Sequence, residues 1–511
     1  MSHEATKGLP LAAGPLLLPA LFAGALGLRT LEPPPPVSTT RNTYEERWLD
    51  VRLDHFSAFY NDTFPMRFYY NGEFAVNNQV NNHIVIFVGG EWAISPGWVT
   101  GGLAHEFAGY IQAGVFYTEH RYYGLTRPTN DTEVSNLRYL TVDQALADLA
   151  QFIEYIKSDE FENGLYREGK VVLVGCSYAG SMATWMRLAY PHLTDAVLSD
   201  SGPLHAQTDF VEYLEKINSV LLEQGGQTCV NSIQEAVNEI VPLLSTQTGV
   251  TTISDVFNTC SPQTTNPMDS STFFWFGITE TLAYLVQYAM PGHITDACSV
   301  LTNSSESSAM RRLANYVNAH PWSQPCIRNS YSDVVAGHTN TSFDSSDSVM
   351  RLWTYQSCVE FGWFQTTNGN LHVFANAIPL EYFHQMCQDF FSLYFNSNLT
   401  ESGVARTNLL FAGLSHLPDY TISVAGGADP WAPMGPTGTH ESALAPVFVV
   451  PGVSHCRAIQ STENSESTEL HEVKWEVMNI LSEYVTGTRM SAANGVFASL
   501  ALILCAVAIA A

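Results

Sequence analysis

The stretch over residues 171–188 constrains the fold of this chain more than any other. Residues 171–174 are four consecutive apolar residues, which predict a buried strand. Ser177 follows in a turn of small residues, and residues 181–188 are typical of a helix. A strand, a sharp turn that carries a serine and a helix form a nucleophile elbow, in which small residues leave room for a strained backbone. Taken alone, the pattern also fits an ordinary buried turn.

A serine nucleophile needs a base, and the base needs a carboxylate that orients it. Asp429 follows a predicted strand over residues 420–424, and His455 follows another over residues 446–450. Both lie just past the carboxyl end of a strand, where open α/β sheets place their sites. Singly, the aspartate fits a turn and the histidine a surface loop. The order Ser177, Asp429, His455 is that of α/β-hydrolases, and we predict these three as the catalytic residues.

The chain falls into a sheet region that is interrupted once. Apolar strands that alternate with helical segments predict a mostly parallel sheet covered on both faces. The predicted strands span residues 48–53, 67–70, 83–88, 114–118 and 195–201, and a helix with Thr141 as its N-cap spans residues 141–157.

Few strands are expected from about residue 206 to residue 414, where helical segments such as 209–224, 231–245 and 274–288 dominate. An insertion at this point of the chain would lie over the carboxyl ends of the strands, above Ser177. We therefore expect an α/β-hydrolase fold with a large inserted helical cap domain. The expected parts are a signal peptide (1–27), a proline-rich linker (28–44), the first hydrolase part (45–205), the cap with disulfides (206–414), the second hydrolase part (415–486) and a tail of small and hydrophobic residues (487–511).

Both ends of the chain carry features of the secretory pathway. The apolar run over residues 9–26 and a small-x-small site over residues 25–27 predict a signal peptide, with a signal anchor as the alternative. The apolar end over residues 496–511 is short for a spanning helix, which needs ~20 residues. It resembles a GPI-attachment signal, with a short membrane anchor or a simple hydrophobic tail as alternatives. Glycosylation sequons begin at Asn61, Asn130, Asn303, Asn340 and Asn398.

The nine cysteines agree with an oxidising compartment. Six lie between residues 229 and 387, which predicts a disulfide-braced region, although the sequence leaves the connectivity open. Cys176 and Cys456 flank Ser177 and His455, and they either pair or stay free thiols. We expect an extracellular or cell-surface protein, with a GPI anchor as one form of attachment, or alternatively a protein of the lysosomal or endosomal lumen.

The net charge and the motifs of the sequence limit the kinds of molecule that we expect this chain to bind. The formal net charge of −27 argues against nucleic-acid binding, which needs a basic face. The sequence shows no metal-ligand cluster, phosphate-binding glycine loop or dinucleotide fingerprint, so we expect neither a metal nor a cofactor. Membrane attachment through the tail and a homodimer both stay open.

Several motifs together resemble the S28 serine peptidases, a family that includes prolyl carboxypeptidases and dipeptidyl peptidases. The resemblance runs from about residue 48 to residue 484, and residues 353–362 and 454–456 look closest to its thymus-specific branch. The sequence departs from the family at Cys176, where glycine is usual, and at the loop over residues 89–92. The motifs that carry the resemblance are residues 119–124, 140–148, 175–180 and 429–431.

The resemblance implies a serine-type exopeptidase that cleaves peptides near a chain end, at proline, with the same three catalytic residues. A carboxylester hydrolase on this fold and a catalytically silent surface binding protein are the alternatives. Elbow geometry assigns the oxyanion hole to the backbone N–H groups of Tyr178 and Gly90. Trp431 and Tyr178 are the expected walls of the substrate pocket, and core packing is the alternative for the tryptophan.

Overall fold

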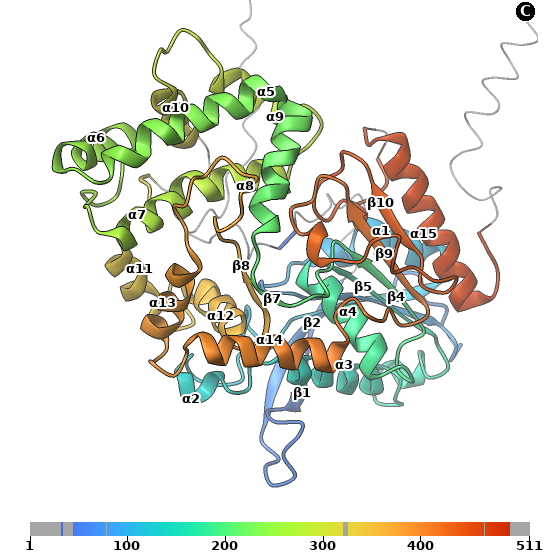
Figure 1. Ribbon diagram of the computed structural model, residues 1–511. Coiled ribbons are helices and arrows are strands. Elements are labelled where there is room, and N and C mark those ends of the chain that lie inside the picture. The colour runs from blue at the N-terminus through green and yellow to red at the C-terminus, as the bar shows by residue number, and fades with distance from the viewer. Residues whose placement is uncertain (1–31, 34–43, 78, 320–324, 464, 491–511) are drawn as a thin grey trace, which may run out of the picture.

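A computed structural model describes residues 32–33, 44–77, 79–319, 325–463 and 465–490 (Figure 1). Its centre is an eight-stranded sheet in the order β1-β2-β4-β3-β5-β6-β9-β10. The strands are β1 (Glu45–Arg52), β2 (Thr63–Asn71), β3 (His83–Val88), β4 (Ala113–Thr118), β5 (Val171–Cys176), β6 (Ala196–Asp200), β9 (Thr421–Gly426) and β10 (Val447–Val450).

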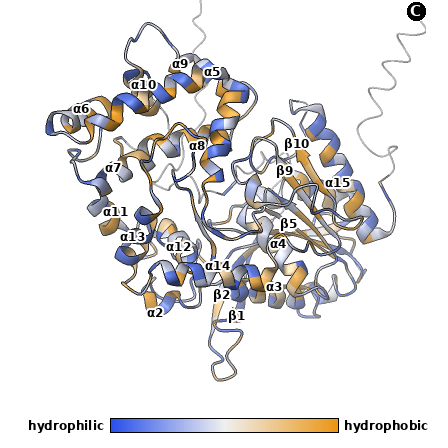
Figure 2. Ribbon diagram, viewed as in Figure 1, coloured by the Kyte–Doolittle hydropathy of each residue, from blue (hydrophilic) through white to orange (hydrophobic). Residues whose placement is uncertain are grey.

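Helices cover both faces of the sheet, as the apolar strands predict. From β4 to β10 all neighbouring strands are parallel, whereas β1 and β2 join by antiparallel pairing. Parallel neighbours need crossover connections, which these helices supply. Helices α1 (Gly102–Ile111) and α15 (Thr468–Thr486) contact each other and pack on the sheet, and α3 (Val142–Ile156) packs with α4 (Tyr178–Ala189). Figure 2 shows hydrophobic residues along the central strands and mixed colours along the helices.

Residues 201–420, between β6 and β9, form the helical insertion, whose helices gather in a body beside the sheet (Figure 1). These helices are α5 (Glu212–Leu243), α6 (Gln247–Phe257), α7 (Pro267–Phe273), α8 (Glu280–Gln287), α9 (His293–Leu301), α10 (Ala309–Ala319), α11 (Tyr331–His338), α12 (Ser348–Gln356), α13 (Leu380–Phe390) and α14 (Ser397–Phe411). Two π-helical segments, Phe274–Thr279 and Ser357–Phe361, join α7 to α8 and continue α12.

The insertion differs from the sequence expectation in two places. The predicted helices over 209–224 and 231–245 are one helix, α5, broken at Gly226, which has a φ of 80°. Two short strands, β7 (Gln207–Asp209) and β8 (Gly362–Phe364), form a parallel pair. Three residues are too few for an alternating pattern to reveal a strand.

Disulfides brace the insertion as predicted. Cys229 pairs with Cys298, Cys260 with Cys326, and Cys358 with Cys387. Each bond closes a loop within the insertion and so lowers the entropy of its unfolded chain. Four disulfides, including the one between Cys176 and Cys456, fit the secretory pathway or the lysosome.

The chain ends are only partly described. Glu32 and Pro33, from the expected linker, are hydrogen-bonded to the hydrolase part. Glu32 accepts hydrogen bonds from Ser95 N and the Tyr117 hydroxyl. The expected signal peptide, residues 28–31 and 34–43 of the linker and the tail from residue 491 lie outside the described residues. Within the described part, no helix has both the length and the apolar character needed to cross a bilayer. All five sequon asparagines are exposed, as glycosylation requires.

Candidate active site

The predicted elbow is present at the end of β5. Ser177 lies between β5 and α4 with a φ of 58° and a ψ of −134°, and its N–H donates to Asp200 O at 2.9 Å. A non-glycine residue at such a φ is strained, and strain of this kind is typical of a nucleophile elbow. Ser177 is half-buried between two buried neighbours. A Cβ atom on Gly175 would lie 2.2 Å from Ala179 O, so this glycine permits the helix to cross close to the strand.

We expect Gly175→Ala to disturb the elbow. The added methyl would meet backbone, which cannot move aside cheaply, so the free energy of unfolding should fall by about 1–3 kcal/mol and peptidase activity should fall with it. Gly438→Ala is the matched control, because a Cβ there meets nothing within 4 Å. Chemical denaturation and activity of both variants measure the effect. Equal stability of the two variants would contradict the close packing at Gly175.

Asp429 and His455 come together at the same edge of the sheet. Asp429 follows β9, His455 follows β10, and both side chains are buried. His455 Nδ1 lies 2.9 Å from each carboxylate oxygen of Asp429. Because Nδ1 donates to the carboxylate, Nε2 of the neutral ring is left as a proton acceptor. Trp431 N also donates to Asp429 Oδ1 at 2.9 Å and fixes the carboxylate.

The helical insertion holds the histidine loop from the other side. His455 N donates to Gln287 O at 3.1 Å, and the Ser454 hydroxyl donates to Val286 O. Both acceptors are at the end of α8, and the ring of the next residue, Tyr288, lies 6.2 Å from the His455 ring, centroid to centroid. The insertion therefore lies directly against the candidate base.

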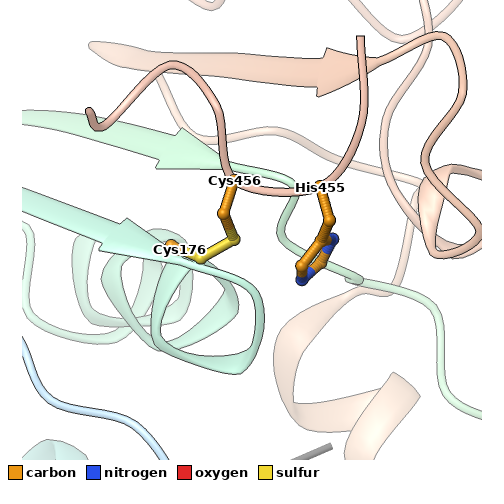
Figure 3. Close-up of side chains that lie close together, drawn as sticks. All are labelled: Cys176, His455 and Cys456. Carbon is orange, nitrogen blue, oxygen red and sulfur yellow. A yellow bond between two sulfur atoms is a disulfide. The ribbon is translucent and has the colours of Figure 1, made fainter. Parts of the chain in front are cut away.

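A disulfide joins the elbow to the histidine loop. Cys176 and Cys456 are bonded, with Cα atoms 5.6 Å apart, and His455 lies beside them (Figure 3). A His455 ring nitrogen lies within 4.8 Å of both sulfurs. Since the sulfurs are bonded to each other, they offer no thiolate to a metal. Among the described residues, no hydrogen bond joins Ser177 Oγ to the His455 ring. Such bonds often tighten only when substrate binds.

The expected oxyanion donors lie on neighbouring strands. The N–H of Tyr178 is in the first turn of α4 and so has no acceptor within that helix. Gly90 follows β3, which pairs with β5. A Cβ on Gly90 would lie 2.6 Å from the Trp92 ring, so an indole covers this glycine.

The expected pocket residues are both buried. Trp431 Nε1 donates to Gln287 Oε1 at 3.2 Å, and its ring packs against Phe210, Tyr213 and Trp363 with centroids 5.5 to 5.6 Å away. Trp431 is thus part of an aromatic cluster between the acid loop and the insertion.

The Tyr178 side chain faces the interior instead of solvent. Its hydroxyl lies 3.0 Å from His120 Nε2 and accepts from Gln356 Nε2 at 3.1 Å. His120 Nδ1 faces the Arg121 carbonyl at 2.8 Å, so Nδ1 carries the proton and Nε2 accepts from Tyr178. Burial lowers the pKa of His120 to about 4, which keeps this ring neutral.

Gln356 connects this network to the insertion. Its side chain accepts from the Tyr123 hydroxyl at 2.6 Å and donates to Glu360 Oε2 at 3.2 Å. Glu360 also accepts from Val142 N at 3.0 Å. Thr141 is the N-cap residue of α3, as predicted, but its side chain makes no cap hydrogen bond. Burial raises the pKa of Glu360 to about 7. Gln356 and Glu360 both lie in the motif over residues 353–362, but no spacing rule reveals their contacts.

Comparison with known proteins identifies the chain. A model of the family described as serine carboxypeptidase S28 matches residues 51–477. The chain belongs to this family. It is therefore a serine peptidase on an α/β-hydrolase fold with an inserted helical region, and its substrates are peptides.

Relatives of this S28 peptidase cover nearly the whole chain. The thymus-specific serine protease of Mus musculus is 28% identical, over 88% of this chain and 89% of that protein. The lysosomal Pro-X carboxypeptidase of Homo sapiens is 26% identical, over 86% of this chain and 88% of that protein. Among solved structures, a peroxisomal α/β-hydrolase of Saccharomyces cerevisiae is 10% identical over 92% of this chain and 97% of that chain, with a TM-score of 0.37.

A second buried aspartate supports the histidine loop of this S28 peptidase. Asp200, at the end of β6, accepts from Ala458 N at 2.7 Å and Ile459 N at 3.0 Å. Burial raises the pKa of Asp200 to about 6, against the two backbone hydrogen bonds that lower it. Sequence reasoning missed this residue, because nothing local to residue 200 points to residues 458 and 459.

Glu91, in the loop after β3, is a buried carboxyl with an unmatched oxygen. Glu91 Oε2 has no hydrogen-bond partner, and burial raises the pKa of this group to about 8. Besides burial, a negative charge on Glu91 raises the pKa values of the nearby hydroxyls of Tyr123, Tyr178 and Tyr288. Near neutral pH the carboxyl is therefore held protonated, in contrast to an exposed glutamate.

We expect Glu91 to make the fold less stable as pH rises. The folded state keeps the proton up to about pH 8, whereas the unfolded chain releases it near 4.5. The stability this proton confers is full below pH 4.5 and is lost as pH rises towards 8, on the order of a few kcal/mol. Glu91→Gln, which cannot ionise, should melt close to wild type at pH 5 and above it at pH 8.

Thermal melting at both pH values measures this effect. Glu160 is exposed, so Glu160→Gln is the control. Its melting temperature should differ from that of wild type by the same amount at both pH values. A Glu91→Gln difference that does not change with pH would contradict the protonated carboxyl.

Proposed function

We propose that this S28 peptidase is an exopeptidase that cleaves peptides near a chain end, at proline, with Ser177, His455 and Asp429 as its catalytic triad. The observation that carries the proposal is the buried pair of Asp429 and His455, with 2.9 Å contacts, held beside the strained serine elbow. The nucleophile, base and orienting acid of a serine hydrolase need this combination.

The mechanism is acyl transfer. Ser177 Oγ attacks the scissile carbonyl carbon while His455 Nε2 takes its proton, and the same nitrogen then protonates the leaving amine. Asp429 holds Nδ1–H and stabilises the imidazolium. The N–H groups of Tyr178 and Gly90 bind the developing oxyanion. Water then releases the acyl group by the reverse sequence of proton transfers.

Two observations support cleavage near a chain end and at proline. The end of α8 lies against His455, so the insertion limits the approach of an extended chain through the site. A relative across most of the chain is named lysosomal Pro-X carboxypeptidase.

Two blocked peptide sets test the proposal on purified protein at acidic and neutral pH. One set has a free amino terminus, proline in second place and a blocked carboxyl end. The other has a blocked amino terminus and a penultimate proline. Dipeptide release from the first set, or loss of one carboxyl-terminal residue from the second, supports the proposal and identifies which end is bound. Cleavage of alanine analogues at equal rates would overturn the proline preference.

The proposal also covers the cellular location of the protein and its possible assembly into a homodimer. The exposed sequons and disulfides support a glycosylated protein of the cell surface, the extracellular space or the lysosomal lumen. Release of the cell-surface protein by a phosphatidylinositol-specific phospholipase C would support the tail at 487–511 as a GPI signal. Sedimentation of the purified protein tests the homodimer.

A further inference from the structure

The disulfide between Cys176 and Cys456 occupies an unusual place in the chain. It joins the residue immediately before Ser177 to the residue immediately after His455, across a sequence separation of 280. The other disulfides of the described chain join residues within the helical insertion. This one bond therefore links the nucleophile segment to the base segment directly (Figure 3).

The backbone on both sides of this bond is strained. Ser177 has a φ of 58°, and Cys456 has a φ of 57°. Neither residue is glycine, so both conformations persist only where the surroundings hold them. At Cys456 the holding contacts are the disulfide and a hydrogen bond of 3.0 Å from its N–H to Ser201 Oγ.

The remaining anchors of the histidine loop are hydrogen bonds rather than covalent bonds. Asp200 holds the backbone at Ala458 and Ile459, further along the loop. Gln287 holds His455 N from the insertion. Asp200 O also accepts from Ser177 N at 2.9 Å, so among these contacts the disulfide is the covalent link between the loop and the strand before Ser177.

We propose that the Cys176–Cys456 disulfide is a positioning device of the active site, which sets His455 against Ser177, and that breaking it slows catalysis while the fold persists. This inference rests on the proposed triad. Two thiols are not covalently bonded and need more room than a disulfide, so the two segments separate and Cys456 can relax. A displacement on the order of 1 Å costs about 10²-fold in rate when it misplaces reacting groups.

The chemistry of the switch is a thiol–disulfide exchange. A dithiol gives two electrons and two protons, so the bond between the sulfurs breaks, two S–H groups form and the dithiol closes into its own disulfide. Both cysteines are buried, so a reductant reaches this bond more slowly than it would reach an exposed disulfide.

The test compares Cys176→Ala/Cys456→Ala with Cys229→Ala/Cys298→Ala, which removes a disulfide between α5 and α9. The readouts are the rate of fluorophosphonate labelling at Ser177, kcat and KM on a cleaved peptide, and the melting temperature. We expect the first variant to lose about 10²-fold in kcat and in labelling rate with little change in KM. The second should melt lower and keep both rates.

Reduction of folded wild type covers the case in which the first variant does not fold. The protein is treated with a dithiol, the freed thiols are mapped by alkylation, and reoxidation is followed by the labelling rate. Loss of labelling when residues 176 and 456 become free, with return on reoxidation, supports the proposal. Unchanged labelling with both thiols free overturns it. If oxidised wild type takes no label, the triad proposal fails instead, so the two failures are distinguishable.

Discussion

Ser177→Ala should lower kcat by about 10⁴–10⁶-fold, because it removes the atom that attacks the substrate and forms the acyl-enzyme. The methyl group leaves the backbone hydrogen bond from residue 177 to Asp200 in place. The melting temperature should therefore stay close to that of wild type. Steady-state kinetics on the best peptide of the two blocked sets, together with thermal melting, measure both effects.

Ser181→Ala is the matched control for this variant. Ser181 lies in α4, the helix that follows Ser177, and its hydroxyl donates to Pro203 O at 2.6 Å instead of facing substrate. Its loss should lower stability by about 1 kcal/mol and leave kcat near wild type. A Ser177→Ala protein that keeps more than a small fraction of activity would show that the nucleophile is another residue.

Asp429→Asn should lower kcat by about 10⁴-fold without unfolding the protein. The amide can still accept from Trp431 N, but its NH₂ group can face Nδ1 and favour the tautomer with the proton on Nε2. His455 would then have no free acceptor for the Ser177 proton. Kinetics across the pH range, with melting as a check of folding, measure the change.

The comparison for this variant is Asp200→Asn. Asp200 accepts from two backbone N–H groups and makes no hydrogen bond to the His455 ring, so its amide analogue keeps an acceptor for the loop. We expect a much smaller loss of kcat than for Asp429→Asn. Equal losses would mean that the two aspartates act through loop position alone and would contradict the orienting role of Asp429.

The sequence predicted those parts of the fold that local pattern determines. Apolar runs marked β3 and β5, because strands buried on both faces have no polar side to interrupt them. The positions of Asp429 and His455 followed from the strands that precede them. The pairing of the insertion's cysteines did not follow, because spacing alone leaves connectivity open.

Local sequence patterns could not predict the contacts between segments that lie far apart in the chain. Thr141 is the N-cap residue of α3 as predicted, yet its side chain makes no cap hydrogen bond, and Glu360, 218 residues beyond Val142, accepts from Val142 N. Gln356 lies in a motif of the family resemblance, but no spacing rule reveals that its amide donates to the Tyr178 hydroxyl. The buried Asp200 and the Cys176–Cys456 bond depend in the same way on the whole fold.

The most direct test of the triad is covalent labelling of the folded, oxidised protein with a fluorophosphonate, followed by peptide mass spectrometry. We expect one adduct, on the peptide that contains Ser177. The adduct should disappear in Ser177→Ala and form far more slowly in His455→Ala. Absence of a label on protein that melts cooperatively, or a label on a different serine, would contradict Ser177 as the nucleophile activated by His455.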